Sequence, residues 1–117
     1  MDNAVYTMGV DIGSTASKCV ILQNGQAVAG QAVIPAGTGT SGPGRAVAEA
    51  LHQAGLTPAQ LSMTVATGYG RNAFDSAQRT YSEMSCHAKG AHYLCPEART
   101  VIDIGGQDAK ALRILPD

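Results

Sequence analysis

Residues 8–22 read MGVDIGSTASKCVIL, which is an apolar run, a short polar loop and a second apolar run. Because strand character over residues 5–10 ends at Asp11, the pattern predicts a hairpin whose first strand brings a carboxylate to the turn. Gly13 allows the turn, and the loop offers hydroxyl and backbone N–H groups that suit a phosphate. A carboxylate beside a phosphate needs a divalent cation between them, so Asp11 is a candidate Mg²⁺ ligand. The hydroxyl groups belong to Ser14, Thr15 and Ser17.

Residues 100–115 read TVIDIGGQDAKALRIL and repeat this arrangement. An apolar strand again runs into Asp-x-Gly at Asp103, turns on glycine and leaves as a strand. One such turn says little, because Asp and Gly are common in turns of every kind. Two of them, each flanked by strands, favour two loops that hold one polyphosphate from opposite sides. Asp11 and Asp103 would then both serve the metal.

Composition limits the functions that the chain can have. The 117 residues are 44% apolar with a net charge of −1, which predicts one small domain and no basic surface for nucleic acid or an anionic membrane. No apolar run approaches the roughly 20 residues of a membrane-spanning helix, and the N-terminus does not resemble a signal peptide. We therefore expect a cytoplasmic location.

Three cysteines, Cys19, Cys86 and Cys95, give an odd number without C-x-x-C spacing. This argues against a disulfide framework and against a four-thiolate metal site. We expect reduced, structural thiols, with Cys19 buried as a small apolar residue of a strand.

Between the two hairpins, strands and helices are predicted in alternation. The dipeptide at 24–25, Asn-Gly, predicts a tight turn into a third strand over residues 27–34. Residues 36–44 are glycine-rich but lack the Gly-Lys-Ser/Thr of a Walker loop, so we interpret them as a flexible connection. A helix capped by Ser41 or Gly42 then follows. Its predicted buried stripe is Ala46, Val47, Ala50, Leu51 and Ala54.

A compact apolar strand over residues 63–67 runs into the polar loop 68–72, a position where open α/β sheets bind ligands. Arg71 in this loop is interpreted as facing solvent or a partner, because no second basic residue lies beside it. The sequence TYSE at residues 80–83 matches a capping box that opens a second helix. The pattern alone favours Glu83 as a helix cap; the alternative is a general base that orients an attacking water.

Three antiparallel strands followed by helix, strand, helix and strand is the order of a ribonuclease H-like lobe, so we expect an α/β fold with a mixed sheet. The chain resembles the first lobe of the actin-like ATPase superfamily, which includes sugar kinases and chaperone ATPases. Five motifs in order resemble the ATP-dependent activators of 2-hydroxyacyl-CoA dehydratases, relatives of the benzoyl-CoA reductase ATPase subunits. They are GVDIGSTASK (9–18), GTGTSGP (37–43), ATGYGRN (66–72), SEMSCHA (82–88) and VIDIGGQD (101–108).

This resemblance implies a homodimeric, oxygen-sensitive protein of anaerobic bacteria with one [4Fe–4S] cluster between its subunits. Such a protein couples ATP hydrolysis to low-potential electron transfer into a partner dehydratase or related reductase component. By position, the resemblance assigns Asp11 and Asp103 to Mg²⁺, and Glu83 and Asp103 to catalysis. The phosphates of ATP or ADP would be held by Gly13, Ser14, Thr15 and Lys18 in the first loop and by Gly105, Gly106 and Gln107 in the second.

Members of this family are considerably longer than this chain. The resemblance therefore implies that residues 1–117 are a single N-terminal nucleotide-binding lobe, without the second lobe, the cluster cysteines or the adenosine loop. We expect neither ATPase activity nor electron transfer from this chain alone. Two alternatives stay open: a non-catalytic module that docks a partner through residues 68–72, and a lobe of a sugar or acetate kinase.

Overall fold

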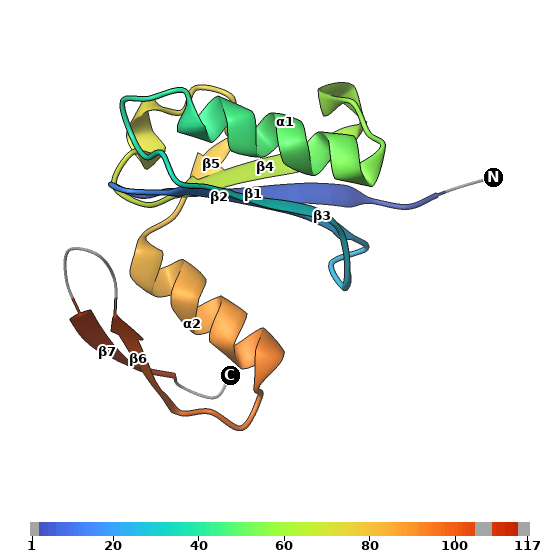
Figure 1. The fold of residues 1–117 in the computed structure, drawn as a ribbon. Coiled ribbons are helices and arrows are strands. Elements are labelled where there is room, and N and C mark those ends of the chain that lie inside the picture. The colour runs from blue at the N-terminus through green and yellow to red at the C-terminus, as the bar shows by residue number, and fades with distance from the viewer. Residues whose placement is uncertain (1–2, 105–108, 115–117) are drawn as a thin grey trace. The chain divides into compact units, whose positions relative to one another are not determined.

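The computed structural model describes residues 3–104 and 109–114. They form two compact units, one within residues 1–80 and one within residues 81–117, and each is described by itself. Figure 1 labels the elements. Within the described ranges, no helix is long and apolar enough to cross a membrane. The single lobe expected for residues 1–117 stays a prediction.

The first unit is built on a five-stranded sheet. Its strands are β1 (Tyr6–Ile12), β2 (Ser17–Gln23), β3 (Ala27–Ile34), β4 (Leu61–Thr67) and β5 (Arg79–Thr80). The order in the sheet is β3-β2-β1-β4-β5, with β1 antiparallel to β2 and parallel to β4. This is the mixed sheet that the sequence predicts. Strand β5 is not predicted by the sequence, because two residues are too few to show a period.

The turn between β2 and β3 forms where the sequence predicts it. Asn24 and Gly25 both have positive φ, 56° and 67°. These are the angles for which Asn-Gly is preferred in hairpin connections. The Asn24 backbone N–H donates to the Val5 carbonyl at 2.7 Å, and the Val5 N–H donates to Asn24 Oδ1 at 2.9 Å. The turn is thereby tied to the chain that enters β1.

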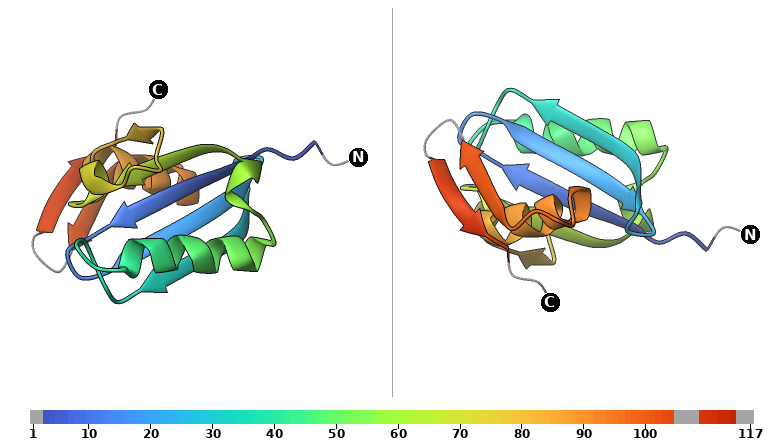
Figure 2. Two further views of the ribbon diagram at one scale, coloured as in Figure 1. Left: turned by 90° about the horizontal axis from the view of Figure 1, so that it is seen from above. Right: turned by 90° about the horizontal axis from the view of Figure 1, so that it is seen from below.

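Helix α1 (Gly42–Ala54) covers one face of this sheet, as Figure 2 shows from above. It approaches β3 so closely that a Cβ on Gly30 would lie 2.2 Å from the Ala50 carbonyl oxygen. The predicted stripe is confirmed, with Val47 and Ala54 partly buried beside its fully buried members. The core between helix and sheet consists of Met8, Val10, Ile12, Cys19, Ile21, Ala32, Ala46, Ala50 and Leu51.

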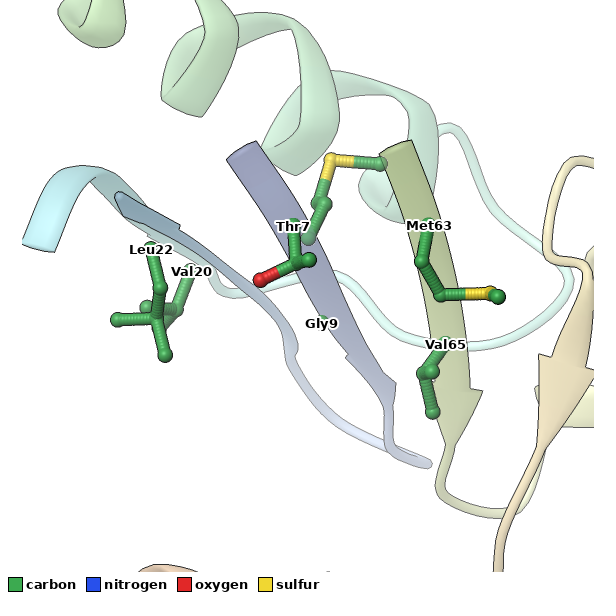
Figure 3. A pocket seen from close by; sticks show the side chains of 7 residues that line it. Thr7, Gly9, Val20, Leu22, Met63 and Val65 are labelled. Carbon is green, nitrogen blue, oxygen red and sulfur yellow. The ribbon is translucent and has the colours of Figure 1, made fainter. Parts of the chain in front are cut away.

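The opposite face of the sheet carries a pocket. Side chains alternate along a strand, so the neighbours of the core residues in β1, β2 and β4 lie on this face. Figure 3 shows the side chains that line the pocket. The lining is apolar apart from the Thr7 hydroxyl, so it offers no charged group to a phosphate. The lining residues are Thr7, Met8, Gly9, Val20, Leu22, Met63 and Val65.

The second unit consists of helix α2 (Glu83–Leu94) and the strands β6 (Thr100–Ile104) and β7 (Ala109–Arg113). The two strands are antiparallel, which confirms the second predicted hairpin. From the sequence, residues 100–104 are expected to be the last strand of the lobe. In the part of the chain that the structure describes, β6 pairs with β7 in a sheet of its own, and β5 lies beside β4.

Helix α2 begins later than the sequence predicts. Ser82 is its N-cap, and the Ser82 Oγ accepts a hydrogen bond from the Ser85 N–H at 3.2 Å. Glu83 is therefore the first residue of the helix and not the third, so the predicted capping box with Thr80 as cap is wrong. A carboxylate in the first turn still favours the helix through its interaction with the helix dipole.

Candidate phosphate-binding site

Asp11 lies where the first strand meets the turn. Its Cα is paired with that of Lys18 on β2 and with that of Thr67 on β4. Asp11 Oδ2 lies 3.4 Å from Lys18 Nζ, and the two side chains are 27% and 46% exposed. An ion pair this accessible contributes about 1 kcal/mol or less to stability. The pair therefore places one negative and one positive group at the turn without fixing either firmly.

The turn itself has unused hydrogen-bond donors. The Gly13 N–H donates to the Ala16 carbonyl at 2.9 Å and closes the loop. Within the described ranges, the N–H groups of Ser14, Thr15 and Ala16 donate to no backbone carbonyl. Successive free N–H groups at a tight turn form the kind of concavity that binds an anion. Lys18 Nζ adds a positive charge, since it lies 3.8 Å from the place of a Cβ on Gly13.

Ser17 does not belong to this donor set, contrary to the expectation from the sequence. Its side chain is completely buried, and its Oγ donates to the Ala36 carbonyl at 2.7 Å. The hydroxyl therefore ties β2 to the glycine-rich segment 36–42 and is not available to a ligand.

The segment 36–42 is not the flexible connection that the sequence analysis expected. The Thr38 N–H donates to the Gly13 carbonyl at 2.9 Å. A Cβ on Gly37 would lie 2.4 Å from the carbonyl oxygens of both Gly13 and Ser14. The Thr40 hydroxyl donates to the Gly37 carbonyl at 2.6 Å and accepts from the Gly42 N–H at 2.9 Å. The segment therefore braces the first turn, and Gly37 is needed for the close approach.

The loop that follows β4 also packs against the end of β1. The Gly70 N–H donates to the Ile12 carbonyl at 3.0 Å. Arg71 is half-buried, and its NH1 group donates to the Gly68 carbonyl at 3.0 Å. The guanidinium group donates to a carbonyl of its own loop, and the interpretation that it faces solvent or a partner stays a prediction. Three loops, 13–16, 36–42 and 68–73, thus meet where β1 ends.

The second hairpin shares a feature with the first that the sequence analysis missed. Asp11 is paired across the ladder with Lys18, and Asp103 is paired with Lys110. The signal was present in the sequence as Asp-Ile-Gly-x4-Lys at both places. Lys110 therefore joins the candidate residues. Gly105, Gly106 and Gln107 lie outside the described residues.

Glu83 and Asp103 both belong to the second unit. Glu83 is half-buried at the first position of α2, and Asp103 is the fourth residue of β6. The structure thus brings Asp11, the first loop and Lys18 together in the first unit. That the two hairpins face one polyphosphate stays a prediction, as do the roles of Glu83 and Asp103.

The cysteines do not fit a [4Fe–4S] cluster. Burial of Cys19 in the core raises the pKa of its thiol from 9.0 to about 12, which disfavours the thiolate that ligation requires. All three cysteines are free; Cys86 is half-buried and Cys95 is exposed. Among the residues that the structure describes, no three His, Cys, Asp or Glu side chains are grouped so that they could hold a metal ion.

Known proteins are similar to this chain in sequence and in fold. The activator of lactoyl-CoA dehydratase from Anaerotignum propionicum is 54% identical over 110 residues, which are 94% of this chain and 42% of that protein. The solved structure of (R)-2-hydroxyglutaryl-CoA dehydratase component A from Acidaminococcus fermentans matches with a TM-score of 0.91 and 47% identity, over 95% of this chain and 43% of that one. The activator of 2-hydroxyisocaproyl-CoA dehydratase from Clostridium difficile, solved with bound ADPNP, matches with a TM-score of 0.91 and 50% identity, over 93% of this chain and 41% of that one.

The chain spans about two fifths of the length of these relatives. The α/β fold of the actin-like ATPase superfamily is confirmed by the solved structures. The sequence pattern of the BadF/BadG/BcrA/BcrD ATPase family matches residues 8–115, nearly the whole chain, and the chain therefore belongs to that family.

Proposed function

We propose that this chain is the N-terminal nucleotide-binding part of an ATP-hydrolysing activator of a 2-hydroxyacyl-CoA dehydratase or a related reductase. The observation that carries the proposal is the first turn, where free N–H groups, one carboxylate and one ammonium group meet. The similarity to dehydratase activators, one of them solved with bound ADPNP, supports the same function.

In this proposal each residue at the first turn has one task. The N–H groups and hydroxyls of Ser14 and Thr15 bind phosphate oxygens, and Lys18 neutralises part of the phosphate charge. Asp11 would hold Mg²⁺ through water, which fits a single, partly exposed carboxylate better than direct coordination by several protein ligands. The bound Mg²⁺ would draw negative charge from the phosphate oxygens. Asp11 would hold the hydrated ion, and Lys18 would then be left to face the phosphate oxygens.

The second hairpin completes the proposed site. Asp103 and Lys110 take the same ladder positions as Asp11 and Lys18, which supports an equivalent role for the second pair. Gly105, Gly106 and Gln107 would supply the second phosphate loop. Glu83 would orient the attacking water and accept its proton.

The remaining properties of such an activator belong to the proposal as well. They are a cytoplasmic location, a homodimer, and electron transfer into a dehydratase or reductase partner. Within the described residues, no three His, Cys, Asp or Glu side chains are grouped so that they could hold a metal ion. Because the chain belongs to the BadF/BadG/BcrA/BcrD family, we do not retain the kinase alternative.

One observation favours a second function. Tyr69, in the loop after β4, is 57% exposed, which suits a residue that contacts another protein. A non-catalytic docking module that uses residues 68–72 would need no nucleotide. The two functions differ in what they require of Asp11.

Isothermal calorimetry with Mg-ATP and Mg-ADP tests the proposal on the 117-residue chain. We expect saturable binding that is weakened by about tenfold or more in Asp11→Asn, since the carboxylate no longer holds the ion. The matched control is Asp75→Asn, which removes an exposed carboxylate of the same unit and should bind like the unaltered chain. Absence of binding up to millimolar nucleotide, or equal binding by Asp11→Asn, would refute the proposed site in this chain.

A further inference from the structure

Gly68 lies directly against the carboxylate of Asp11. It follows the last residue of β4, is buried, and has φ of +92°. A Cβ at this position would lie 2.6 Å from Asp11 Oδ1 and 2.4 Å from the Ile12 carbonyl oxygen. Carbon atoms do not approach oxygen this closely without displacement, so only a residue without a side chain leaves Asp11 where it is.

The backbone at Gly68 is itself held in place. Its carbonyl accepts from the Arg71 NH1 group at 3.0 Å and from the Arg71 backbone N–H at 3.2 Å. The loop is anchored to β1 by the bond from the Gly70 N–H to the Ile12 carbonyl at 3.0 Å. Gly70 is also confined, because a Cβ there would lie 2.5 Å from Thr38 Oγ1. The surface that Gly68 presents to the carboxylate is therefore fixed from several sides.

The two oxygens of Asp11 consequently have different neighbours. Oδ1 lies against Gly68, and Oδ2 lies 3.4 Å from Lys18 Nζ. The ion pair alone is too weak to fix the carboxylate, as its exposure shows. Close packing against a rigid backbone limits rotation of the carboxylate in a way that a solvated ion pair does not.

We propose that Gly68 is a positioning residue for Asp11. Gly68 sets the orientation in which the carboxylate binds the hydrated Mg²⁺ of a bound nucleotide. Arg71 holds Gly68 in place by donating to the Gly68 carbonyl. This inference rests on the proposed function of the first turn. It assigns to the loop after β4 a role in metal binding that does not require Arg71 to touch the phosphates.

The dependence of ATP affinity on Mg²⁺ tests the proposal, because a general loss of structure would weaken binding with and without the ion. Calorimetric titrations with ATP are carried out in excess Mg²⁺ and in excess EDTA. In the unaltered chain we expect Mg²⁺ to tighten binding by about tenfold or more. In Gly68→Ala we expect most of this gain to be lost, with the affinity in EDTA changed by less than about threefold.

Gly39→Ala is the matched control. Gly39 also has a positive φ, +80°, but a Cβ there would have no neighbour within 4 Å. The two alanine variants therefore carry similar backbone strain, and only Gly68→Ala presses on Asp11. Gly39→Ala should keep the Mg²⁺ gain. A gain retained by Gly68→Ala, or lost equally by both variants, would overturn the proposal.

Arg71→Met gives a second test that introduces no clash. It removes the hydrogen bond to the Gly68 carbonyl but leaves the space around Asp11 unchanged. We expect a partial loss of the Mg²⁺ gain with unchanged affinity in EDTA. An affinity lowered to the same extent in both conditions would mean that Arg71 contacts phosphate, and would refute its positioning role.

A failure of the proposed function is distinguishable from a failure of this inference. If the unaltered chain binds no ATP in either condition, the proposed phosphate site fails. The carboxyl ¹³C resonance of Asp11, measured by NMR without nucleotide, then decides about Gly68. A resonance that moves in Gly68→Ala and not in Gly39→Ala supports the positioning role, and a resonance unchanged in Gly68→Ala overturns it.

Discussion

Burial of the Cys19 thiol makes the stability of the first unit depend on pH. The side chain is 1% exposed in the core, and desolvation raises the pKa of its thiol from 9.0 to about 12. The unfolded chain has the ordinary value. Between pH 9 and pH 12 the unfolded state therefore loses a proton that the folded state keeps, so rising pH favours unfolding. The contribution of the neutral, buried thiol to the free energy of unfolding is fully present below pH 9 and is lost as the pH rises towards 12.

The size of the effect follows from the two pKa values. At pH 10 about ten unfolded thiols are ionised for each one that is not, which lowers the free energy of the unfolded state by about 1 kcal/mol. At pH 8 the same effect is negligible. We therefore expect the free energy of unfolding to fall by about 1 kcal/mol between pH 8 and pH 10 because of Cys19 alone.

Urea unfolding followed by circular dichroism, with a reductant present, measures this change. Other groups also titrate in this range, so the comparison is with Cys19→Ala, which shares all of them. The variant starts from a lower stability, because a buried sulfur atom is lost. The decrease in its free energy of unfolding between pH 8 and pH 10 should be smaller than that of the unaltered chain by about 1 kcal/mol. Equal decreases would refute the claim that the thiol is neutral and desolvated in the core.

Two substitutions test the close contacts of the first unit by the same unfolding measurement. Ser17→Ala should lower the free energy of unfolding by about 1–3 kcal/mol, because the Ala36 carbonyl loses its buried donor; an unchanged stability would mean that water replaces the hydroxyl. Gly30→Ala should cost about 1–3 kcal/mol, since its Cβ would push against Ala50 and force α1 away from β3. Gly9→Ala, where a Cβ meets nothing within 4 Å, should be neutral or slightly stabilising, and a loss equal to that of Gly30→Ala would contradict the steric explanation.

Much of the candidate site could be predicted because its residues are close in sequence. Asp11, the loop after it and Lys18 belong to one hairpin, and a hairpin is specified by strand alternation and turn residues within a few positions. The same local information predicts the Asn24-Gly25 turn and the buried stripe of α1.

The parts that could not be predicted depend on contacts between distant segments. Ser17 looks like its neighbours Ser14 and Thr15 in the sequence, yet its hydroxyl is buried against Ala36. Gly37 looks like any glycine of a mobile connection, although it packs against two carbonyl oxygens of the first turn. The residue at which α2 begins depends on neighbours that the local pattern does not contain. The same holds for the two-residue strand β5, which forms by pairing with β4.

The sequence by itself determined the family, the order of strands and helices apart from β5, and the residue types at the first turn, because each of these is written in short, local patterns. Only the tertiary structure decided which hydroxyls and N–H groups stay available to a ligand. It also decided that Gly68 lies against Asp11 and that Arg71 turns back to hold it. The physical reason is that every buried polar group must find a partner and every close approach needs a small residue, and both conditions are met by segments brought together only in the folded chain.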